Sequence, residues 1–358
     1  MTNLDIAQQR LHNQLITQRM FEKPGDVVRW LGAVQAQDYL GSLWAIGLRL
    51  PHTTEADIEQ AIADKTIVRT WPMRGTIHFV APEDARWMLK LMASRIIESN
   101  KQRLYKQFDL DEAVFARSRE VFVQVLQGGR RLTRNAMYKS LEAAHISVAG
   151  TRGLHILWRL AQEGLICFGP REGQQPTFVL LDEWVPSPRA LERDEALAEL
   201  ARRYFTSHGP ATLQDFVWWT GLTIADAKVG LEMARADLIQ EVIDGQTYWL
   251  APSLPIVKVT SPTAHLLPPF DEYTVAYKDR SAILDPAYAE QTGNGIFSPT
   301  IAVNGQIVGI WKRTLKKDRV ILAPNPLTPL NEAETCSLAA TANRYGRFLG
   351  KSVNTTLF

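Results

Sequence analysis

Hydrophobic and polar residues follow helical spacing in long segments of the chain and strand spacing in shorter ones. In the first third of the chain, helical spacing covers residues 6–16, 24–34, 55–63, 82–106 and 111–126, and strand spacing covers residues 67–71 and 76–80. The two strands flank a short turn, Pro72-Met-Arg-Gly75, as in a β-hairpin. Helices followed by a hairpin predict a winged helix-turn-helix unit in this part of the chain.

The same order of elements recurs twice farther along the chain. Thr133 and Thr212 each have the pattern of an N-cap before an amphipathic helix, and second helices are expected at residues 151–163 and 223–236. Two short strands close each copy, at residues 166–168 and 177–180 in the first and at residues 239–242 and 247–250 in the second. Because self-similarity indicates repeated units, we expect two further winged helices.

The pattern changes to strand spacing from residue 256 onward. Asn304-Gly305 lies between apolar segments 301–303 and 307–311, which favours a type I′ hairpin, and Asp244-Gly245 gives a similar signal. A last helix is expected at residues 331–349.

Together these patterns predict an α+β fold of three tandem winged helix-turn-helix units and a C-terminal β-rich module. The expected boundaries are residues 1–82 for winged helix 1, residues 83–186 for linker helices and winged helix 2, residues 187–254 for winged helix 3, and residues 255–358 for the C-terminal module with its final helix.

Composition indicates a folded globular protein. Of 358 residues, 46% are hydrophobic and 22% charged, which are ordinary values, and no apolar run approaches the ~20 residues that span a bilayer. The first 18 residues are polar and lack a signal-peptide pattern, so we expect a cytoplasmic protein with no membrane partner. Cys167 and Cys336 are far apart, which excludes a disulfide scaffold, and both are expected to be small buried hydrophobes.

Charge is unevenly distributed although the net charge is only +2. Residues 65–139 contain fifteen Lys or Arg against seven Asp or Glu, and residues 300–358 contain eight against three. Residues 181–244, in contrast, contain six basic against twelve acidic residues. Because phosphate binding needs local positive charge, the two basic regions favour a nucleic-acid partner, with solvated helix faces as the alternative.

Motif spacing excludes several enzyme classes. Residues 346–352 resemble a phosphate-binding loop, but three residues separate the glycines where four are needed, and the segment follows a helix. Gly-x-Ser-x-Gly, His-Glu-x-x-His and dinucleotide-binding glycine motifs do not occur in the sequence. The seven histidines are scattered, so we expect no metal and no cofactor. His78 lies in an alternating strand and is expected to be a buried wall residue or, alternatively, to face a site.

Gln35 and Gln37 place two amides two residues apart, after an apolar helix and before a turn that contains Gly41. In an extended or turn geometry both amides would point the same way, whereas in a continuing helix they would diverge by about 200°. On spacing alone the simpler interpretation is a fraying helix end, and joint binding of one small molecule is the alternative.

Longer segments of the chain are similar to the AlkZ-type DNA glycosylases. These bacterial proteins of tandem winged helices excise N-alkylated purines and unhook interstrand crosslinks. Gln35-Ala36-Gln37 resembles their Gln-hydrophobe-Gln catalytic motif, in the branch with Gln at the second position, and Ala36 is a minimal hydrophobe. The similarity continues in residues 69–78, 267–273, 278–280 and 298–313 and extends over essentially the whole chain.

The resemblance implies a monofunctional glycosylase that hydrolyses the N-glycosidic bond of cationic N7- or N3-alkylated purines in duplex DNA, interstrand crosslinks among them. An alkylated cationic purine leaves without a general acid, so Gln35 and Gln37 would orient water at the sugar, since an amide accepts no proton near neutral pH. Asp38 is the competing base, because on a helix it would share a face with Gln35. His78, Asp271 and Tyr273 are auxiliary candidates.

The expected partner is duplex DNA, which the protein would bind as a monomer in a basic cleft. Through this binding the protein would be associated with the bacterial nucleoid. Basic residues on predicted wings, turns and hairpin ends are the candidates for phosphate contact: Arg69, Arg74, Arg130, Arg131, Arg134, Lys312, Arg313, Lys316 and Lys317. The rival hypotheses are a non-enzymatic winged-helix DNA-binding protein or regulator, and a scaffold that has lost activity.

Overall fold

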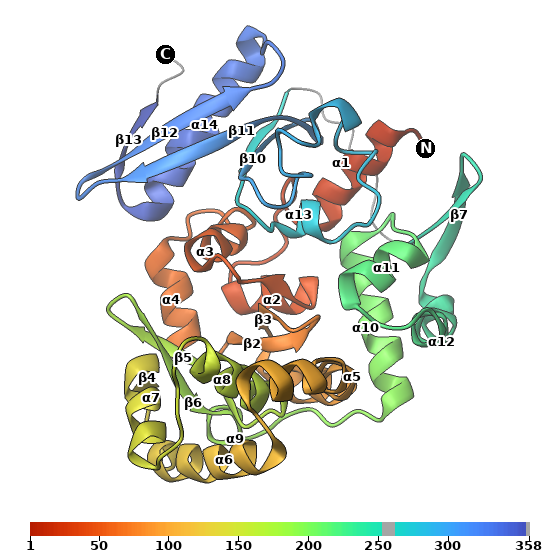
Figure 1. The fold of residues 1–358 in the computed structure, drawn as a ribbon. Helices are drawn as coiled ribbons and strands as arrows, with labels where there is room; N and C mark the ends of the chain where they lie inside the picture. Colours follow the sequence, from red (N-terminus) through yellow and green to blue (C-terminus); the bar gives the residue numbers. More distant parts are fainter. Residues whose placement is uncertain (253–261, 356–358) are drawn as a thin grey trace. The chain divides into compact units, whose positions relative to one another are not determined.

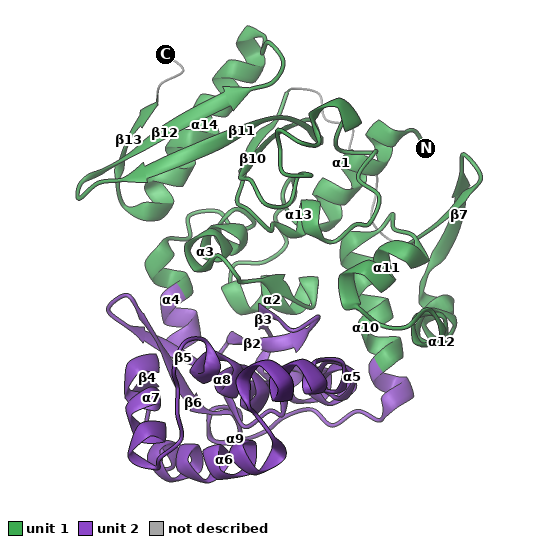
Figure 2. Ribbon diagram, viewed as in Figure 1, with its two compact units in different colours: residues 1–58, 197–358 green, residues 59–196 purple. Residues whose placement is uncertain are grey.

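The computed structural model describes residues 1–252 and 262–355, and its helices and strands are drawn in Figure 1. The chain divides into two compact units, which Figure 2 shows in different colours. Unit 1 contains residues 1–58 and 197–358, and unit 2 contains residues 59–196. The result is a mixed α+β fold. No helix within the described residues is long and apolar enough to cross a membrane.

Unit 1 begins with short helices. The elements of its first segment are α1 (Asn3–Asn13), α2 (Pro24–Leu31), β1 (Val34–Gln35), α3 (Tyr39–Gly47) and the start of α4 (Glu55–Ala63). α2 is three residues shorter than the helix expected at 24–34, because Gly32 adopts φ 79°, outside the helical region. α3 was not expected; seven of its nine residues are buried, so it has no polar face to reveal helical periodicity.

The second segment of unit 1 contains a helical cluster and a hairpin. It is formed by α10 (Arg193–His208, which begins in unit 2), α11 (Leu213–Thr220), α12 (Ile224–Ala234), the 3₁₀ turn η1 (Arg235–Asp237), β7 (Ile239–Ile243) and β8 (Gln246–Leu250). Thr212 caps α11 as expected, and its own backbone N–H donates in return to the Asp215 carboxylate. Asp244-Gly245 forms the predicted two-residue turn, and Ile243 pairs with Gln246.

The third segment of unit 1 is built on a five-stranded sheet of order β13-β12-β11-β10-β9. Its elements are β9 (Ala264–Leu267), α13 (Glu272–Val275), η2 (Pro286–Tyr288), β10 (Thr300–Val303), β11 (Gln306–Leu315), β12 (Arg319–Pro326), α14 (Glu332–Leu349) and β13 (Ser352–Thr355). Asn304 and Gly305 both have positive φ and join β10 to β11, which confirms the predicted hairpin. Part of the strand pattern expected from residue 256, and the expected boundary at 254/255, fall on residues 253–261, outside the described residues.

Unit 2 packs helices against strands that run in the order β3-β2-β5-β6-β4. Its elements are β2 (Val68–Met73), β3 (Thr76–Val80), α5 (Pro82–Phe108), α6 (Glu112–Leu126), β4 (Leu132–Thr133), α7 (Arg134–Ala143), α8 (Arg152–Gln162), β5 (Ile166–Glu172), β6 (Gln175–Leu180) and α9 (Leu181–Trp184). The hairpin turn lies at Arg74 and Gly75, both with positive φ, two residues beyond the start of the expected turn. Aromatic and aliphatic side chains from α6, α8 and the strands form its core.

The predicted burial of the two cysteines holds for one of them and not for the other. Cys167 is buried in β5, as expected, but Cys336 is exposed on α14. The expectation of two small buried hydrophobes is therefore wrong for Cys336, which lies in the first turns of a helix whose polar face meets solvent.

Candidate active site

The Gln35–Gln37 segment is not helical. After α2 ends at Leu31, the chain passes through Gly32 into the two-residue strand β1, and Gln37 and Asp38 form a bend before α3. The interpretation of a fraying helix end is therefore wrong, and so is the placement of Gly41 in a turn, because Gly41 lies in the first turn of α3. Gln35 is 7% exposed and Ala36 is fully buried, whereas Gln37 is exposed.

The Gln35 backbone is held by Glu272, which is not among the candidate residues predicted from the sequence. The Gln35 N–H donates to Oε1 of Glu272 over 2.8 Å, and the indole Nε1–H of Trp219 donates to Oε2 of the same carboxylate, also over 2.8 Å. The Glu272 side chain is fully buried. It lies inside the segment 267–273 that resembles the family, but the 237-residue separation from Gln35 gives no local signal of the contact.

His208 lies beside this carboxylate. Its Nε2 is 3.5 Å from Glu272 Oε2, and its Nδ1 is 2.8 Å from the Ser207 hydroxyl oxygen. Burial lowers the pKa of His208 below its usual value, and the neighbouring Glu272 opposes that effect. The ring stacks on Tyr204 with centroids 5.0 Å apart.

Asp38 caps α3. Its Oδ1 accepts the N–H of Gly41 over 3.2 Å, which is the ordinary role of an N-cap carboxylate. The argument that Asp38 shares a helix face with Gln35 is wrong, because Gln35 lies in strand β1 and Asp38 lies in the bend directly before α3, so neither residue is helical.

Asp271 and Tyr273 are both fully buried in unit 1. The two oxygens of Asp271 accept two hydrogen bonds of 2.9 Å from the Arg49 guanidinium, a bidentate pair with no exposed surface on either side chain. The Tyr273 hydroxyl lies 2.7 Å from the carbonyl oxygen of Gly305 and 3.1 Å from that of Ala7, and burial raises its pKa well above the usual range. These contacts join distant segments of unit 1.

His78 is buried in β3 of unit 2. Its Nδ1 is 3.0 Å from the Thr76 carbonyl oxygen, and its Nε2 is 3.4 Å from the Arg74 guanidinium. The imidazole therefore has neighbours on both nitrogens, as a wall residue of the hairpin does.

The basic candidates of unit 2 occupy different environments. Arg69 is 8% exposed, with its guanidinium 4.3 Å from the Phe168 ring centroid. Arg130 is exposed, but its guanidinium donates to the carbonyl oxygens of Gln127 and Gln124, at the C-terminal end of α6. Arg131 and Arg134 are exposed. A hollow of about 210 Å³ is lined by Arg69 and Arg134 together with aromatic side chains.

The basic candidates of unit 1 lie on or beside the β11–β12 hairpin. Lys312, Lys316 and Lys317 are exposed. Arg313 is half-buried and donates to the hydroxyl of Tyr345 on α14. The carbonyl oxygens of Lys316 and Lys317 accept hydrogen bonds from Lys351 Nζ, which steadies the turn and leaves both lysine side chains at its surface.

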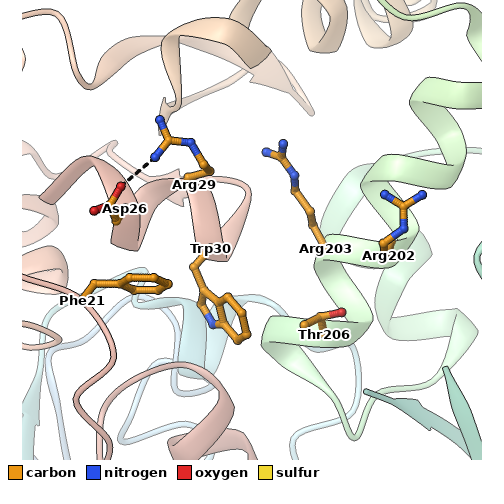
Figure 3. A pocket seen from close by; sticks show the side chains of 7 residues that line it. All are labelled: Phe21, Asp26, Arg29, Trp30, Arg202, Arg203 and Thr206. Atoms are coloured by element: carbon orange, nitrogen blue, oxygen red, sulfur yellow. Dashed lines mark hydrogen bonds and ion pairs between the residues drawn. The ribbon is translucent and has the colours of Figure 1, made fainter. Parts of the chain in front are cut away.

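Unit 1 also contains a cavity of about 340 Å³ between α2 and α10, shown in Figure 3. Its lining residues are Phe21, Asp26, Arg29, Trp30, Arg202, Arg203 and Thr206. Three arginines would favour an anion, but each has a carboxylate partner: Arg29 binds Asp26, Arg203 binds Glu199, and Arg202 binds Glu199 and Asp237. The balanced charges give this cavity no excess attraction for phosphate.

No three His, Cys, Asp or Glu side chains in the described parts of the chain are grouped so that they could hold a metal ion. Within unit 1, the segment around β1 carries the side-chain amides of Gln35 and Gln37 and the Asp38 carboxylate, and the buried carboxylate of Glu272 binds its backbone.

Comparisons with known proteins give one consistent result. The model of the family described as DNA glycosylase AlkZ-like matches residues 28–348. The chain is 27% identical over 343 residues to the interstrand DNA cross-link repair glycosylase of Streptomyces sahachiroi, and the match covers 89% of each chain. The solved structure of Streptomyces sahachiroi DNA glycosylase AlkZ superposes with a TM-score of 0.78 at 22% identity, over 99% of this chain and 100% of that one, and so shares its fold. The chain belongs to the AlkZ-like family of DNA glycosylases.

Proposed function

We propose that this enzyme is a monofunctional DNA glycosylase that hydrolyses the N-glycosidic bond of cationic N7- or N3-alkylated purines in duplex DNA. Interstrand crosslinks through such purines are among the proposed substrates, because the relative from Streptomyces sahachiroi is named an interstrand DNA cross-link repair glycosylase. The family match favours an enzyme over a non-enzymatic regulator.

The observation that carries the proposal is the geometry of the Gln-x-Gln segment. Gln35 lies in a strand and Gln37 in a bend, so the helical geometry that would direct their amides about 200° apart is absent. Gln37 is exposed and therefore open to a macromolecular substrate, whereas the Gln35 backbone is fixed by Glu272.

The proposed chemistry uses water and two amides. An N7- or N3-alkylated purine already carries a positive charge, so it departs as a neutral base without protonation and leaves an oxocarbenium-like sugar. The amide oxygens of Gln35 and Gln37 accept hydrogen bonds from the attacking water and align it with C1′. As the new C1′–O bond forms, the water loses a proton to the solvent, because the amides do not take it. Uncharged bases such as uracil are poorer leaving groups, and a side-chain amide does not protonate them; we therefore expect slow or absent excision.

The proposed DNA-binding surface comes from tandem winged helices. In unit 2 the order α6, β4, α7, α8, β5, β6 with β4 paired to β6 supports this interpretation. In unit 1 the order α10, α11, α12, β7, β8 parallels it, and a bridge between Ala211 and Trp249 occupies the place of the β4–β6 pair. We propose the segment boundaries at residues 82, 186 and 254, a monomer, and association with the nucleoid through DNA.

The test is the release of 7-methylguanine from methylated duplex DNA by the purified full-length chain. We expect release of the free base, with an abasic site and no strand cleavage. A parallel reaction with uracil-containing duplex is the control and should give no product. Release of 7-methylguanine at the uncatalysed rate would contradict the proposal. Unhooking is tested separately, by separation of the two strands of a crosslinked duplex on a denaturing gel.

A further inference from the structure

Glu272 and Trp219 form a buried support beneath the Gln-x-Gln segment. β1 contains only two residues and comes shortly after Gly32, whose φ is positive, and a hydrogen bond from its backbone to a buried side chain also holds the segment. The Glu272 carboxylate binds the backbone N–H of Gln35 through one oxygen and the Trp219 indole N–H through the other. A displacement of about 1 Å in a reacting group is enough to cost a large factor in rate, so such a support has catalytic value.

The two bonds require a carboxylate rather than an amide. Both neighbours are N–H donors, and each takes a different oxygen of the same side chain. An ionised carboxyl group offers two acceptor oxygens, whereas a glutamine offers one oxygen and one NH₂ group that would face a donor.

Burial of the Glu272 carboxylate costs free energy, which indicates that this side chain has a specific role. Glu272 has no exposed surface, and a buried carboxylate loses several kcal/mol of hydration, which hydrogen bonds to it must offset. Trp219 is also fully buried, and its ring lies next to Gly32, where an added Cβ would be 3.5 Å from Cη2. The support thus lies beside Gly32 and binds Gln35.

We propose that Glu272 is the positioning residue for Gln35: its carboxylate, itself held by Trp219, fixes the backbone of the Gln-x-Gln segment so that the Gln35 amide is in place for the attacking water. This inference rests on the proposed role of Gln35. It assigns Glu272 a role in kcat and none in DNA binding.

The first experiment compares Glu272→Gln with a matched control, Asp215→Asn. Asp215 is another buried carboxylate of unit 1, and it binds the backbone N–H groups of Thr212 and Lys278 and lies 3.7 Å from Arg10. Both variants lose a buried charge, but only Glu272→Gln changes the side chain that accepts the Gln35 N–H. Single-turnover release of 7-methylguanine, normalised to folded protein, should fall roughly 10- to 100-fold in Glu272→Gln with unchanged duplex Kd. The control should keep the wild-type rate.

A second variant separates positioning from a general loss of stability. In Glu272→Gln with Trp219→Phe, the indole donor is gone, so the amide oxygen is free to accept from Gln35. The NH₂ group then faces His208, whose neutral ring has one acceptor nitrogen. The double variant should therefore recover at least part of the rate although it loses packing. If Glu272 served only stability, adding Trp219→Phe would lower the rate and the melting temperature further.

Amide hydrogen exchange at Gln35 tests the support without reference to catalysis. We expect strong protection in the wild type and in Asp215→Asn, and a clear loss of protection in Glu272→Gln. Unchanged exchange in Glu272→Gln would overturn the positioning role, as would a wild-type excision rate. If the wild-type enzyme releases no 7-methylguanine, the proposed function fails. Loss of protection at Gln35 in Glu272→Gln would still show that Glu272 holds the Gln35 backbone.

Discussion

At the scale of single residues, the two glutamines of the motif are in unequal surroundings. Gln35 is buried, and its backbone is fixed by Glu272, whereas Gln37 is exposed beside the N-terminus of α3. Removal of the Gln37 side chain therefore takes away an amide with little disturbance of packing. That makes Gln37 the cleaner position for a test of catalysis.

Gln37→Ala should lower single-turnover excision of 7-methylguanine by about 10²-fold, because loss of water positioning raises the barrier to hydrolysis. Duplex affinity should change little. The double variant Gln35→Ala/Gln37→Ala should lose less than the product of the two single losses, since both amides hold one water and the second loss acts on water that is already mobile. Multiplicative losses would show that the two glutamines act separately.

Asp38→Asn tests the competing carboxylate mechanism. Asn is as good an N-cap as Asp, so α3 should keep its start and the melting temperature should change little. We expect an excision rate near that of the wild type, with the same pH dependence in Asp38→Asn as in the wild type. A large loss in Asp38→Asn, with a pH profile set by one carboxyl group, would make Asp38 the base and remove the amides from that role.

At the scale of elements, local signals in the sequence were sufficient for caps and tight turns. Thr133 and Thr212 are the N-caps of α7 and α11, and Asn304-Gly305 is the turn between β10 and β11, because each depends on side chains within a few residues. α3 was not predicted because it is buried on nearly all sides. α10 was not predicted because the expected repeat starts at Thr212, after this helix has ended. Glu272 was missed because its bond to Gln35 depends on the tertiary fold.

The element formed by α6, the following turn and α7 carries a prediction about DNA. Arg131 and Arg134 are exposed, whereas the Arg130 guanidinium binds the last carbonyl oxygens of α6. Arg131→Ala with Arg134→Ala should weaken duplex binding for all sequences and reduce the slope of log K against log salt by up to about two, one for each lost phosphate contact. Titrations at several salt concentrations measure this.

Arg130→Ala is the matched control in the same turn. It should leave the salt slope nearly unchanged and lower the melting temperature, because the C-terminal carbonyl groups of α6 lose their donor. An unchanged slope in the Arg131/Arg134 variant would move the phosphate contacts to another surface, and the exposed lysines Lys312, Lys316 and Lys317 of the β11–β12 hairpin would then be tested in the same way.

At the scale of the whole molecule, unit 1 holds several ionisable groups in its interior. Arg49 and Asp271 form a bidentate pair, Arg10 lies 3.7 Å from Asp215, and Glu272 lies among Gln35, Trp219 and His208. The sequence could not reveal these pairs, because their members are far apart along the chain. Removal of one partner from such a pair leaves an uncompensated buried charge. Substitution of these charged residues should therefore lower the free energy of unfolding more than substitution of exposed charged residues.

Two buried histidines give this unit a defined response to acid. Burial, with the neighbouring Arg344 and Arg49, lowers the pKa of His265 to about 4, and burial also lowers that of His208. In the unfolded chain both titrate near their ordinary value. Between that value and the folded pKa the unfolded state binds more protons, so each histidine contributes stability that is present above pH 6.5 and decreases as pH falls below it. For His265 this loss continues to about pH 4.

The free energy of unfolding should therefore decrease as pH is lowered from 6.5 to 4, with His265 accounting for about 3 kcal/mol, since each unit of pKa difference corresponds to about 1.4 kcal/mol. Urea unfolding of wild type and His265→Gln at a series of pH values measures this contribution. Glutamine is neutral throughout, so the variant should lose less stability than the wild type over the same range, and the two curves should converge as pH falls. Curves that stay parallel from pH 7 to pH 4 would mean that His265 titrates alike in folded and unfolded chains, and the acid response would then have to come from His208 and the buried carboxylates.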